Sequence, residues 1–290
     1  MKIAGEILIY LKYTKPRVWG LLVYIGVVGA IIGAGTNPLP ELSLIMLATF
    51  TLIAGTAGSE AITNYIDRDI DSIMKRTQKR PLVTGMISPS GAMTFGIALI
   101  FLSIVPLLVF ERYYAAFFMI AGIVDNVVIY SYFLKRKSSW NIVFGGFSGG
   151  LPVLIGWYVV TDAFSIIPWF LFTMVVIWIP IHIWSIAYLY REDYSNAGVP
   201  MLPVMYPDKI SAKYIAFSAF LLSIFSILIY FVEIHPIIYL IVTLVLVSPL
   251  IHYSYKFMKS PDKKTSLSLF KYSNLFLSVF FSFILIIMFI

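Results

Sequence analysis

Nine long apolar segments, separated by polar connections, constrain this chain more than any other feature. Each is about 20 residues long, the length that a helix needs to cross the hydrocarbon of a bilayer. Only 12% of the 290 residues are charged, against about 25% in ordinary soluble domains, so a water-soluble globule could not cover its surface. The sequence predicts an all-α, multi-pass membrane protein. Its predicted spans are residues 18–36, 41–59, 91–110, 114–133, 141–160, 165–187, 212–231, 235–254 and 268–288.

The distribution of Lys and Arg supports this count of spans. Nine helices place the connections alternately on two sides, and of the 21 Lys and Arg only Arg112 lies on the side opposite the N-terminus. Positive charge marks cytoplasmic loops, so we expect a cytoplasmic N-terminus, an external C-terminus and a location in the cell membrane. The run Lys135-Arg136-Lys137 is interpreted mainly as such a topology signal. Both long connections, 60–90 and 188–211, lie on the cytoplasmic side, where we expect the chemistry.

Composition excludes several other classes of protein. The chain has no Cys, which excludes disulfides, Cys-ligated zinc and a thiol nucleophile. The net charge of +7 is scattered between apolar segments and forms no patch for nucleic acid. There is no low-complexity tract and no composition shift, so residues 1–290 are expected to form one integral-membrane domain.

An acidic stripe follows the second segment. Asn64, Asp67 and Asp71 fall on one face of a helix that continues the span, with Thr63 beside them, whereas Asp69 lies on a different flank. Two carboxylates at this spacing repel each other and call for a cation. Oxygen ligands of this kind suit Mg²⁺, which binds a few carboxylates together with phosphate oxygens.

A basic run begins four residues after the acidic stripe. It contains Lys75, Arg76 and Arg80, and guanidinium groups bind phosphate through paired hydrogen bonds. Acids and bases together predict a metal–diphosphate site. The alternative, from spacing alone, is an ordinary helix end with solvated charges.

The sixth segment ends in a second polar cluster. Its end contains His182, and the loop that follows contains Arg191, Glu192 and Asp193. This layout repeats the first one, because acids and an Arg again follow an even-numbered helix on the same side. It predicts a second half of the same site.

At these residues the chain resembles the protoheme IX farnesyltransferases (haem O synthases), a branch of the UbiA superfamily of intramembrane prenyltransferases. The acidic motif is shared across the superfamily, whereas the strings around His182 and after Asp193 are typical of the haem branch. The matching strings cover residues 13–205 in order: TKPR (14–17), NYIDRDID (64–71), MKRT (74–77), RP (80–81), LKR (134–136), WNIVFGG (140–146), LP (151–152), IGW (155–157), PIHIW (180–184), DY (193–194) and AGVPMLPV (197–204).

The resemblance implies a fold of nine helices around a central cavity. It also implies a reaction, the transfer of farnesyl from farnesyl diphosphate to the vinyl group of haem B, which gives haem O. The implied cofactor is Mg²⁺, and membrane lipid surrounds the enzyme. A downstream haem O-modifying enzyme or a terminal oxidase assembly is a further expected partner.

The resemblance also assigns roles to residues. It implies that Asp67 and Asp71 are catalytic residues that bind the metal and the diphosphate, with Asn64 beside them as a further metal ligand. The residues implied to bind substrate are Asn64, Lys75, Arg76, Arg80, Tyr130, Arg191 and Asp193. Two positions depart from the superfamily pattern, because Thr63 stands where many members have Asn and Ala197 stands where a second pair of acids would end.

Single polar residues in the spans carry competing interpretations. His182 is a candidate iron ligand or base, and the alternative is a histidine satisfied by a neighbouring helix. Asp125 is the one acid expected deep in an apolar span, where ionisable groups are costly. His235 and His252 are expected at the membrane interface.

Three other functions are alternatives to farnesyl transfer to haem. Another UbiA-type prenyltransferase could act on an aromatic quinone precursor or a lipid acceptor. A transporter would place its ionisable residues near the bilayer midplane, whereas all acids here except Asp125 are expected in or near loops. A nonenzymatic assembly factor is the third. The clustering of acids and bases at one face favours the enzyme.

Overall fold

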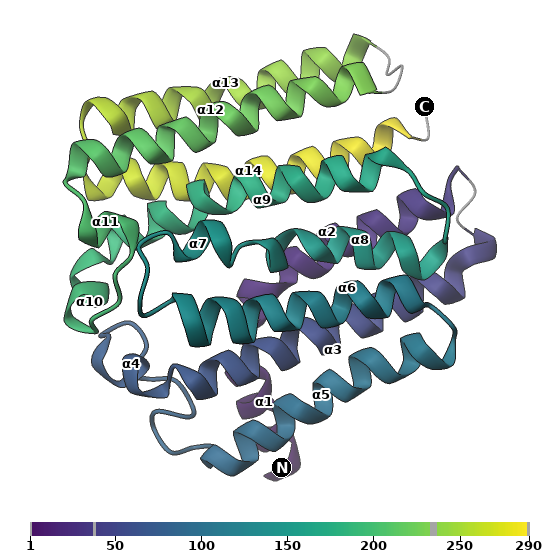
Figure 1. Ribbon diagram of the computed structural model, residues 1–290, viewed down its shortest axis with the longest axis horizontal. Coiled ribbons are helices and arrows are strands. Elements are labelled where there is room, and N and C mark those ends of the chain that lie inside the picture. Colours follow the sequence, from purple (N-terminus) through teal and green to yellow (C-terminus); the bar gives the residue numbers. More distant parts are fainter. Residues whose placement is uncertain (1, 37–38, 233–236, 289–290) are drawn as a thin grey trace.

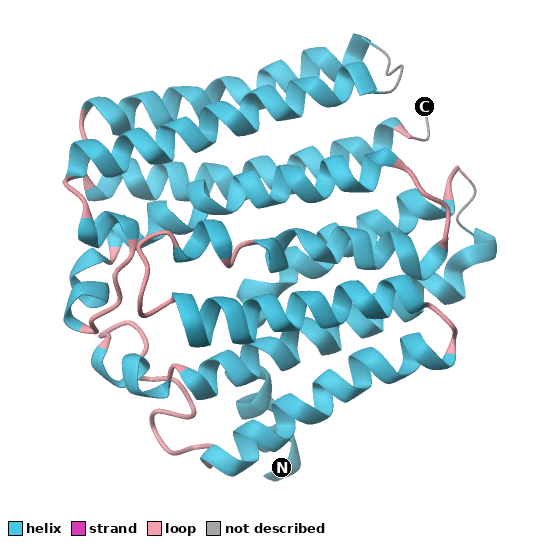
Figure 2. Cartoon of the chain, in the orientation of Figure 1, coloured by secondary structure: helices cyan, strands magenta, loops and turns pink. Residues whose placement is uncertain are grey.

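The protein is all-helical in its computed structural model, which describes residues 2–36, 39–232 and 237–288. Figure 2 shows helices joined by loops and no strand in these residues. Nine helical segments within them are long and apolar enough to cross a membrane. The predicted fold class and the predicted number of spans are confirmed.

The helices follow one another along the chain and are joined by loops, with a long one between α4 and α5 (Figure 1). Their bounds are α1 Lys2–Tyr13, α2 Pro16–Ala34, the 3₁₀ turn η1 Leu39–Glu41, α3 Leu42–Ile66, α4 Arg68–Ile73, α5 Pro89–Val109, α6 Tyr113–Ile123, the π-helix η2 Val124–Leu134, α7 Asn141–Phe144, α8 Phe147–Val160, α9 Ile166–Leu189, α10 Arg191–Asn196, α11 Leu202–Met205, α12 Asp208–Val232, α13 Ile237–Lys259 and α14 Lys263–Ile287.

Two spans differ from their predicted extent. The second was expected to end at residue 59, but α3 continues to Ile66 and therefore carries Glu60 inside the span. The expectation that all acids except Asp125 lie in or near loops is wrong for Glu60. The fourth span is α6 followed by the π-helix η2, in which the N–H of Lys135 donates to the carbonyl of Tyr130 at 2.8 Å. A π-helix admits an extra residue into the helical turn and is frequent at functional sites.

The fifth span lies at the centre of the bundle. In Asn141–Val160, 78% of the most apolar stretch is buried within the protein, against 17% for Tyr113–Leu134. α8 packs against α2, α6 and α9, and Figure 1 shows it between them. Its contact with α2 is very close, because a Cβ at Gly156 would lie 1.8 Å from the carbonyl oxygen of Gly26. Small residues allow such an approach between membrane helices.

This contact generates a prediction for stability. Gly156→Ala should force α2 and α8 apart, because the new methyl group would meet backbone rather than a movable side chain. We expect a loss on the scale of an overpacked core, about 1–3 kcal/mol, measured as a lower midpoint of thermal unfolding in detergent. Gly20→Ala on α2 is the matched control, because nothing lies within 4 Å of its Cβ position. Equal midpoints for the two variants would contradict the packing described.

Candidate active site

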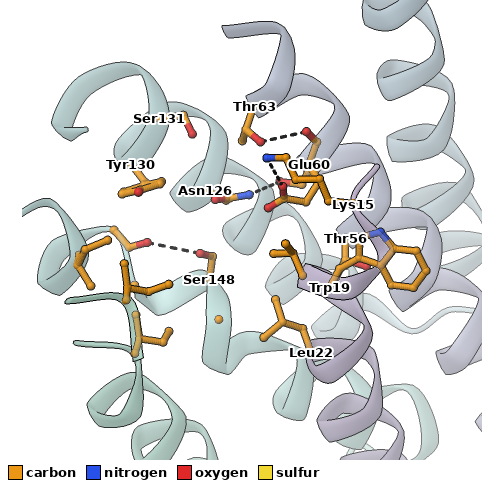
Figure 3. Close-up of a pocket in the computed structure, with 18 of the residues that line it drawn as sticks. Lys15, Trp19, Leu22, Thr56, Glu60, Thr63, Asn126, Tyr130, Ser131 and Ser148 are labelled. Atoms are coloured by element: carbon orange, nitrogen blue, oxygen red, sulfur yellow. Dashed lines mark hydrogen bonds and ion pairs between the residues drawn. The ribbon is translucent and has the colours of Figure 1, made fainter. Parts of the chain in front are cut away.

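A cavity of about 440 Å³ opens at the end of the bundle where α3 meets α4. Its mouth is lined by charged side chains from α3, α4 and the loops, and its interior by apolar residues such as Leu22, Leu52 and Ile155. Figure 3 shows the transition between the two zones, with Lys15, Glu60 and Thr63 near one another and Trp19 and Leu22 farther along the wall. The cavity therefore offers a polar end and a greasy end to one ligand.

Asp67 and Asp71 lie on the same face at the mouth, as the spacing predicted. Asp67 joins α3 to α4, and the helical hydrogen bonds continue across it. Its N–H donates to the carbonyl of Thr63 at 2.9 Å, and the N–H of Asp71 donates to the carbonyl of Asp67 at 2.8 Å. The two residues are only 3% and 4% exposed. Two buried like charges this close need cationic partners.

Those partners come from two other segments of the chain. Lys135, at the end of η2, forms an ion pair with Asp67, and Arg80, in the loop after α4, forms one with Asp71. Burial lowers the pKa of Lys135, but the adjacent carboxylate of Asp67 outweighs burial and raises the pKa above its ordinary value. Lys135 is therefore a permanent cation at the mouth.

The acidic pair fits a divalent metal. Oδ2 of Asp67 contacts Lys135, whereas Oδ1 is buried and has no hydrogen-bond partner among the described residues. A hard cation would satisfy that oxygen. No group of three or more His, Asp or Glu that could hold a metal occurs in the described part of the chain. Phosphate oxygens of a substrate would have to complete the coordination, as is usual for Mg²⁺.

Positive charge exceeds negative charge around the cavity. Its lining includes five cationic side chains, Lys15, Arg17, Arg76, Arg80 and Lys135. Three carboxylates, Glu60, Asp67 and Asp71, also line it. The excess of cations suits an anion with more than one negative charge.

Arg76 joins the two cytoplasmic-type loops predicted to share a site. Its guanidinium donates to the hydroxyl of Tyr194 at 2.8 Å and lies over the rings of Tyr190 and Tyr194, 5.4 and 5.3 Å from their centroids. Its backbone N–H donates to Oδ2 of Asp193 at 3.4 Å. The loop after α4 and the helix α10 therefore meet at the mouth.

His182 lines the opposite wall of the cavity. Its ring is stacked between Trp178, with centroids 4.4 Å apart, and Phe270, with centroids 4.5 Å apart. Nδ1 lies 3.0 Å from the hydroxyl oxygen of Ser273 on α14. The ring is thus fixed in orientation by α9 and α14 together.

A further ion pair lies below the mouth. Nζ of Lys15 is 3.2 Å from Oε2 of Glu60, and the two side chains are 21% and 18% exposed. Nδ2 of Asn126 donates to the hydroxyl of Ser59 at 2.9 Å on the neighbouring turn (Figure 3). These polar groups divide the charged mouth from the apolar interior.

The structure brings six of the predicted site residues to the cavity: Asp67, Asp71, Arg76, Arg80, Tyr130 and His182. The other four do not line it. Asn64 donates to the carbonyl of Tyr13 at 2.6 Å and accepts from Arg80 at 3.4 Å. Lys75 is exposed, and Arg191 pairs with Asp208. Within the described residues, the carboxylate of Asp193 has one hydrogen bond, which it accepts from the backbone N–H of Arg76.

Sequence reasoning missed several cavity residues. Lys135 was interpreted mainly as a topology signal, and nothing in its own segment shows that it meets Asp67. Lys15 and Tyr194 lie within quoted strings but were given no role. Glu60 was detectable, because it precedes Asn64 and Asp67 by four and seven residues and so lies on the same helical stripe.

Two other ionisable residues singled out in the sequence, Asp125 and His252, do not line the cavity. Asp125 is buried in η2 and its Oδ2 accepts the backbone N–H of Ser148 at 2.8 Å, near the beginning of α8. It therefore fastens the π-helix to the central span. His252 is exposed on α13, and His235 lies outside the described residues.

Comparisons with known proteins agree with this geometry. The model of the UbiA prenyltransferase family matches residues 21–284. The chain is similar to the protoheme IX farnesyltransferase of Thermoplasma volcanium, at 53% identity over 97% of this chain and 98% of that protein. It is similar to the one of Thermoplasma acidophilum at 51% identity over 99% of each chain.

Solved structures with a similar fold were also found. A structure of digeranylgeranylglyceryl phosphate synthase matches with a TM-score of 0.79 and 21% identity, over 98% of this chain and 99% of that one. A UbiA homolog from Archaeoglobus fulgidus, bound to DMAPP and Mg²⁺, matches with a TM-score of 0.73 and 18% identity, over 96% and 98%. At these identities the likeness concerns the fold. With the family model and the sequence relatives, it shows that the chain belongs to the UbiA prenyltransferase family.

Proposed function

We propose that this enzyme transfers the farnesyl group of farnesyl diphosphate to the vinyl group of haem B and so forms haem O. The relatives at 50% identity and above are protoheme IX farnesyltransferases along nearly their whole length. The observation that carries the proposal is the cavity itself, in which a cation-rich mouth with a buried acidic pair leads directly into an apolar interior. A prenyl diphosphate is divided in the same way, into a charged diphosphate and an apolar chain.

The mouth binds the diphosphate in this proposal. Arg80, Arg76 and Lys135 supply guanidinium and ammonium donors. Asp67 and Asp71 would hold Mg²⁺ through carboxylate oxygens such as Oδ1 of Asp67, which has no hydrogen-bond partner among the described residues. The metal, when bound, neutralises the phosphate oxygens as negative charge develops on the leaving group. The protein's own cations act in the same direction, because they face the leaving group and not the prenyl chain.

The chemistry needs a dry cavity. The allylic C–O bond breaks and its electron pair leaves with the diphosphate, while the vinyl π electrons form the new C–C bond. Water then adds to the resulting cation as hydroxyl and gives up a proton. Apolar walls exclude water from the earlier cationic stage, and the ring of Tyr130, 5.6 Å from Nζ of Lys135, offers a π face next to the leaving group.

The acceptor lies against the wall that contains His182. Trp178 and Phe270, which stack on the two faces of His182, also line the cavity with aromatic rings, which suits a macrocycle better than a flexible chain. His182 supplies a nitrogen for the haem iron or for a proton. Three relatives of the chain are named protoheme IX farnesyltransferases, which favours haem as the acceptor over a quinone ring or a lipid.

Product analysis tests the function directly. Purified enzyme with Mg²⁺, farnesyl diphosphate and haem B should yield haem O, identified by mass. Parallel reactions with an aromatic quinone precursor and with a lipid acceptor should yield no prenylated product. An active preparation that prenylates one of those acceptors but not haem B would overturn the assignment.

The acidic pair generates a second prediction. Asp67→Ala and Asp71→Ala should each lower turnover about 10²–10³-fold, the scale for loss of one electrostatic stabiliser of the transition state, and should raise the Mg²⁺ concentration required. Asp69→Ala is the matched control, because Asp69 belongs to the same helix but is exposed and pairs with Arg136. Unchanged turnover in the Asp67 variant would rule out its metal role.

Lys135 generates a third prediction. Lys135→Gln removes the cation that pairs with Asp67, so turnover should fall at least tenfold and KM for farnesyl diphosphate should rise. Lys137→Gln lies two residues away in an exposed position and should leave both constants near those of the parent enzyme. If the two variants behave alike, the run has only its topological function.

We propose further that the mouth faces the cytoplasm, with the N-terminus on the same side, and that the chain is one domain. The positive charge of the loops supports this orientation. Because the chain has no Cys, maleimide labelling of a single introduced Cys reports the side of the membrane on which that residue lies, with no labelling of other residues of the chain. Lys79→Cys should resist a membrane-impermeant maleimide in intact cells, and Asp162→Cys should react. The reverse pattern would contradict the orientation.

A further inference from the structure

The ring of His182 has a single open edge. Trp178 stacks on one face at an interplanar angle of 18°, and Phe270 stacks on the other at 28°. Nδ1 is engaged by Ser273, whereas no hydrogen bond from a described residue reaches Nε2. Since His182 lines the cavity, the edge that contains Nε2 is the part of the ring left for a ligand.

Ser273 determines which ring nitrogen carries the proton. Its hydroxyl donates to the carbonyl of Phe270 at 2.8 Å, and a serine hydroxyl has one proton to donate. The contact between the same oxygen and Nδ1 of His182, at 3.0 Å, is therefore made with Ser273 as acceptor. Both bonds exist together only if Nδ1 carries the proton, which leaves Nε2 with a free lone pair.

Ser273 is itself held in place by the helix opposite. The indole N–H of Trp178 donates to the backbone carbonyl of Ser273 at 2.8 Å, and Ser273 is completely buried. Trp178, His182 and Ser273 thus form one closed unit between α9 and α14. A unit that fixes both the orientation and the tautomer of an imidazole is the arrangement found behind histidines that bind metals.

We infer that Ser273 is a positioning residue for His182, which binds the iron of the haem substrate through Nε2. The inference rests on the proposed function only for the identity of that substrate. The hydroxyl of Ser273 keeps the proton on Nδ1, so Nε2 meets the iron as a neutral donor without prior loss of a proton. The stacked rings of Trp178 and Phe270 prevent the imidazole from turning away.

Haem binding in the absence of farnesyl diphosphate tests this directly. Titration of the purified enzyme with haem B should give the absorption spectrum of histidine-ligated haem, and His182→Ala should abolish that spectrum. Ser273→Ala should weaken haem binding about 10–100-fold, the usual effect of removing the group that orients a metal-binding histidine. Ser273→Thr retains the hydroxyl and should restore binding.

Ser266→Ala is the matched control. Ser266 lies on the same helix α14, is buried, and donates across to the carbonyl of Ser185 on α9 at 2.6 Å. Its loss removes a buried bond between the same two helices without touching His182. If Ser273→Ala does not fold, Ser273→Cys preserves the volume with a weak acceptor and should show the same loss of affinity.

Two outcomes would overturn the inference. One is a histidine-type spectrum that persists in His182→Ala. The other is equal haem affinity in Ser273→Ala and Ser266→Ala. A failure of the proposed function would look different, because the parent enzyme would then show the ligated spectrum and still form no haem O when farnesyl diphosphate is added.

Discussion

Burying two carboxylates side by side at the end of a membrane helix costs free energy, and the surrounding chain places cations that offset this cost. Asp67 receives Lys135 from the end of the fourth span, and Asp71 receives Arg80 from the loop after α4. Removing one partner of a buried pair costs about 3–5 kcal/mol, because it leaves an uncompensated charge. The pairs therefore fasten three segments around the mouth.

Most of what the sequence predicted correctly follows from patterns within a single segment of the chain. The nine spans follow from runs of apolar residues, and the shared face of Asp67 and Asp71 follows from helical periodicity, so neither depends on how the helices are arranged. Lys135 and the pair of Lys15 with Glu60 could not be found this way. Each joins segments that are far apart in the sequence, at 68 and 45 residues, and no pattern within one segment records its partner. The ends of the spans were also hard to predict from the sequence. Glu60 belongs to the second span because α3 continues beyond the apolar run to Ile66.

Different kinds of residue line the two walls of the cavity. This difference matches the two unlike substrates of the proposed reaction. Toward α3, α6 and α8 the lining includes Gly55, Gly122 and Gly149 among apolar side chains, and small residues leave room for a flexible chain. Toward α9 and α14 it has stacked rings with fixed hydrogen bonds. The π-helix η2 packs against α3 and α8, and Asp125 fastens it to the central span through the N–H of Ser148. A rigid frame of this kind orders both reactants before any bond breaks.

The contact between Arg76 and Tyr194 also bears on how the entrance of the cavity accommodates an anion. One guanidinium bridges two segments and also lines the cavity. A guanidinium has five N–H donors, and among the described residues Arg76 donates one of them to the hydroxyl of Tyr194. The other donors remain for an anion. Binding of an anion at Arg76 therefore does not require the two segments to separate.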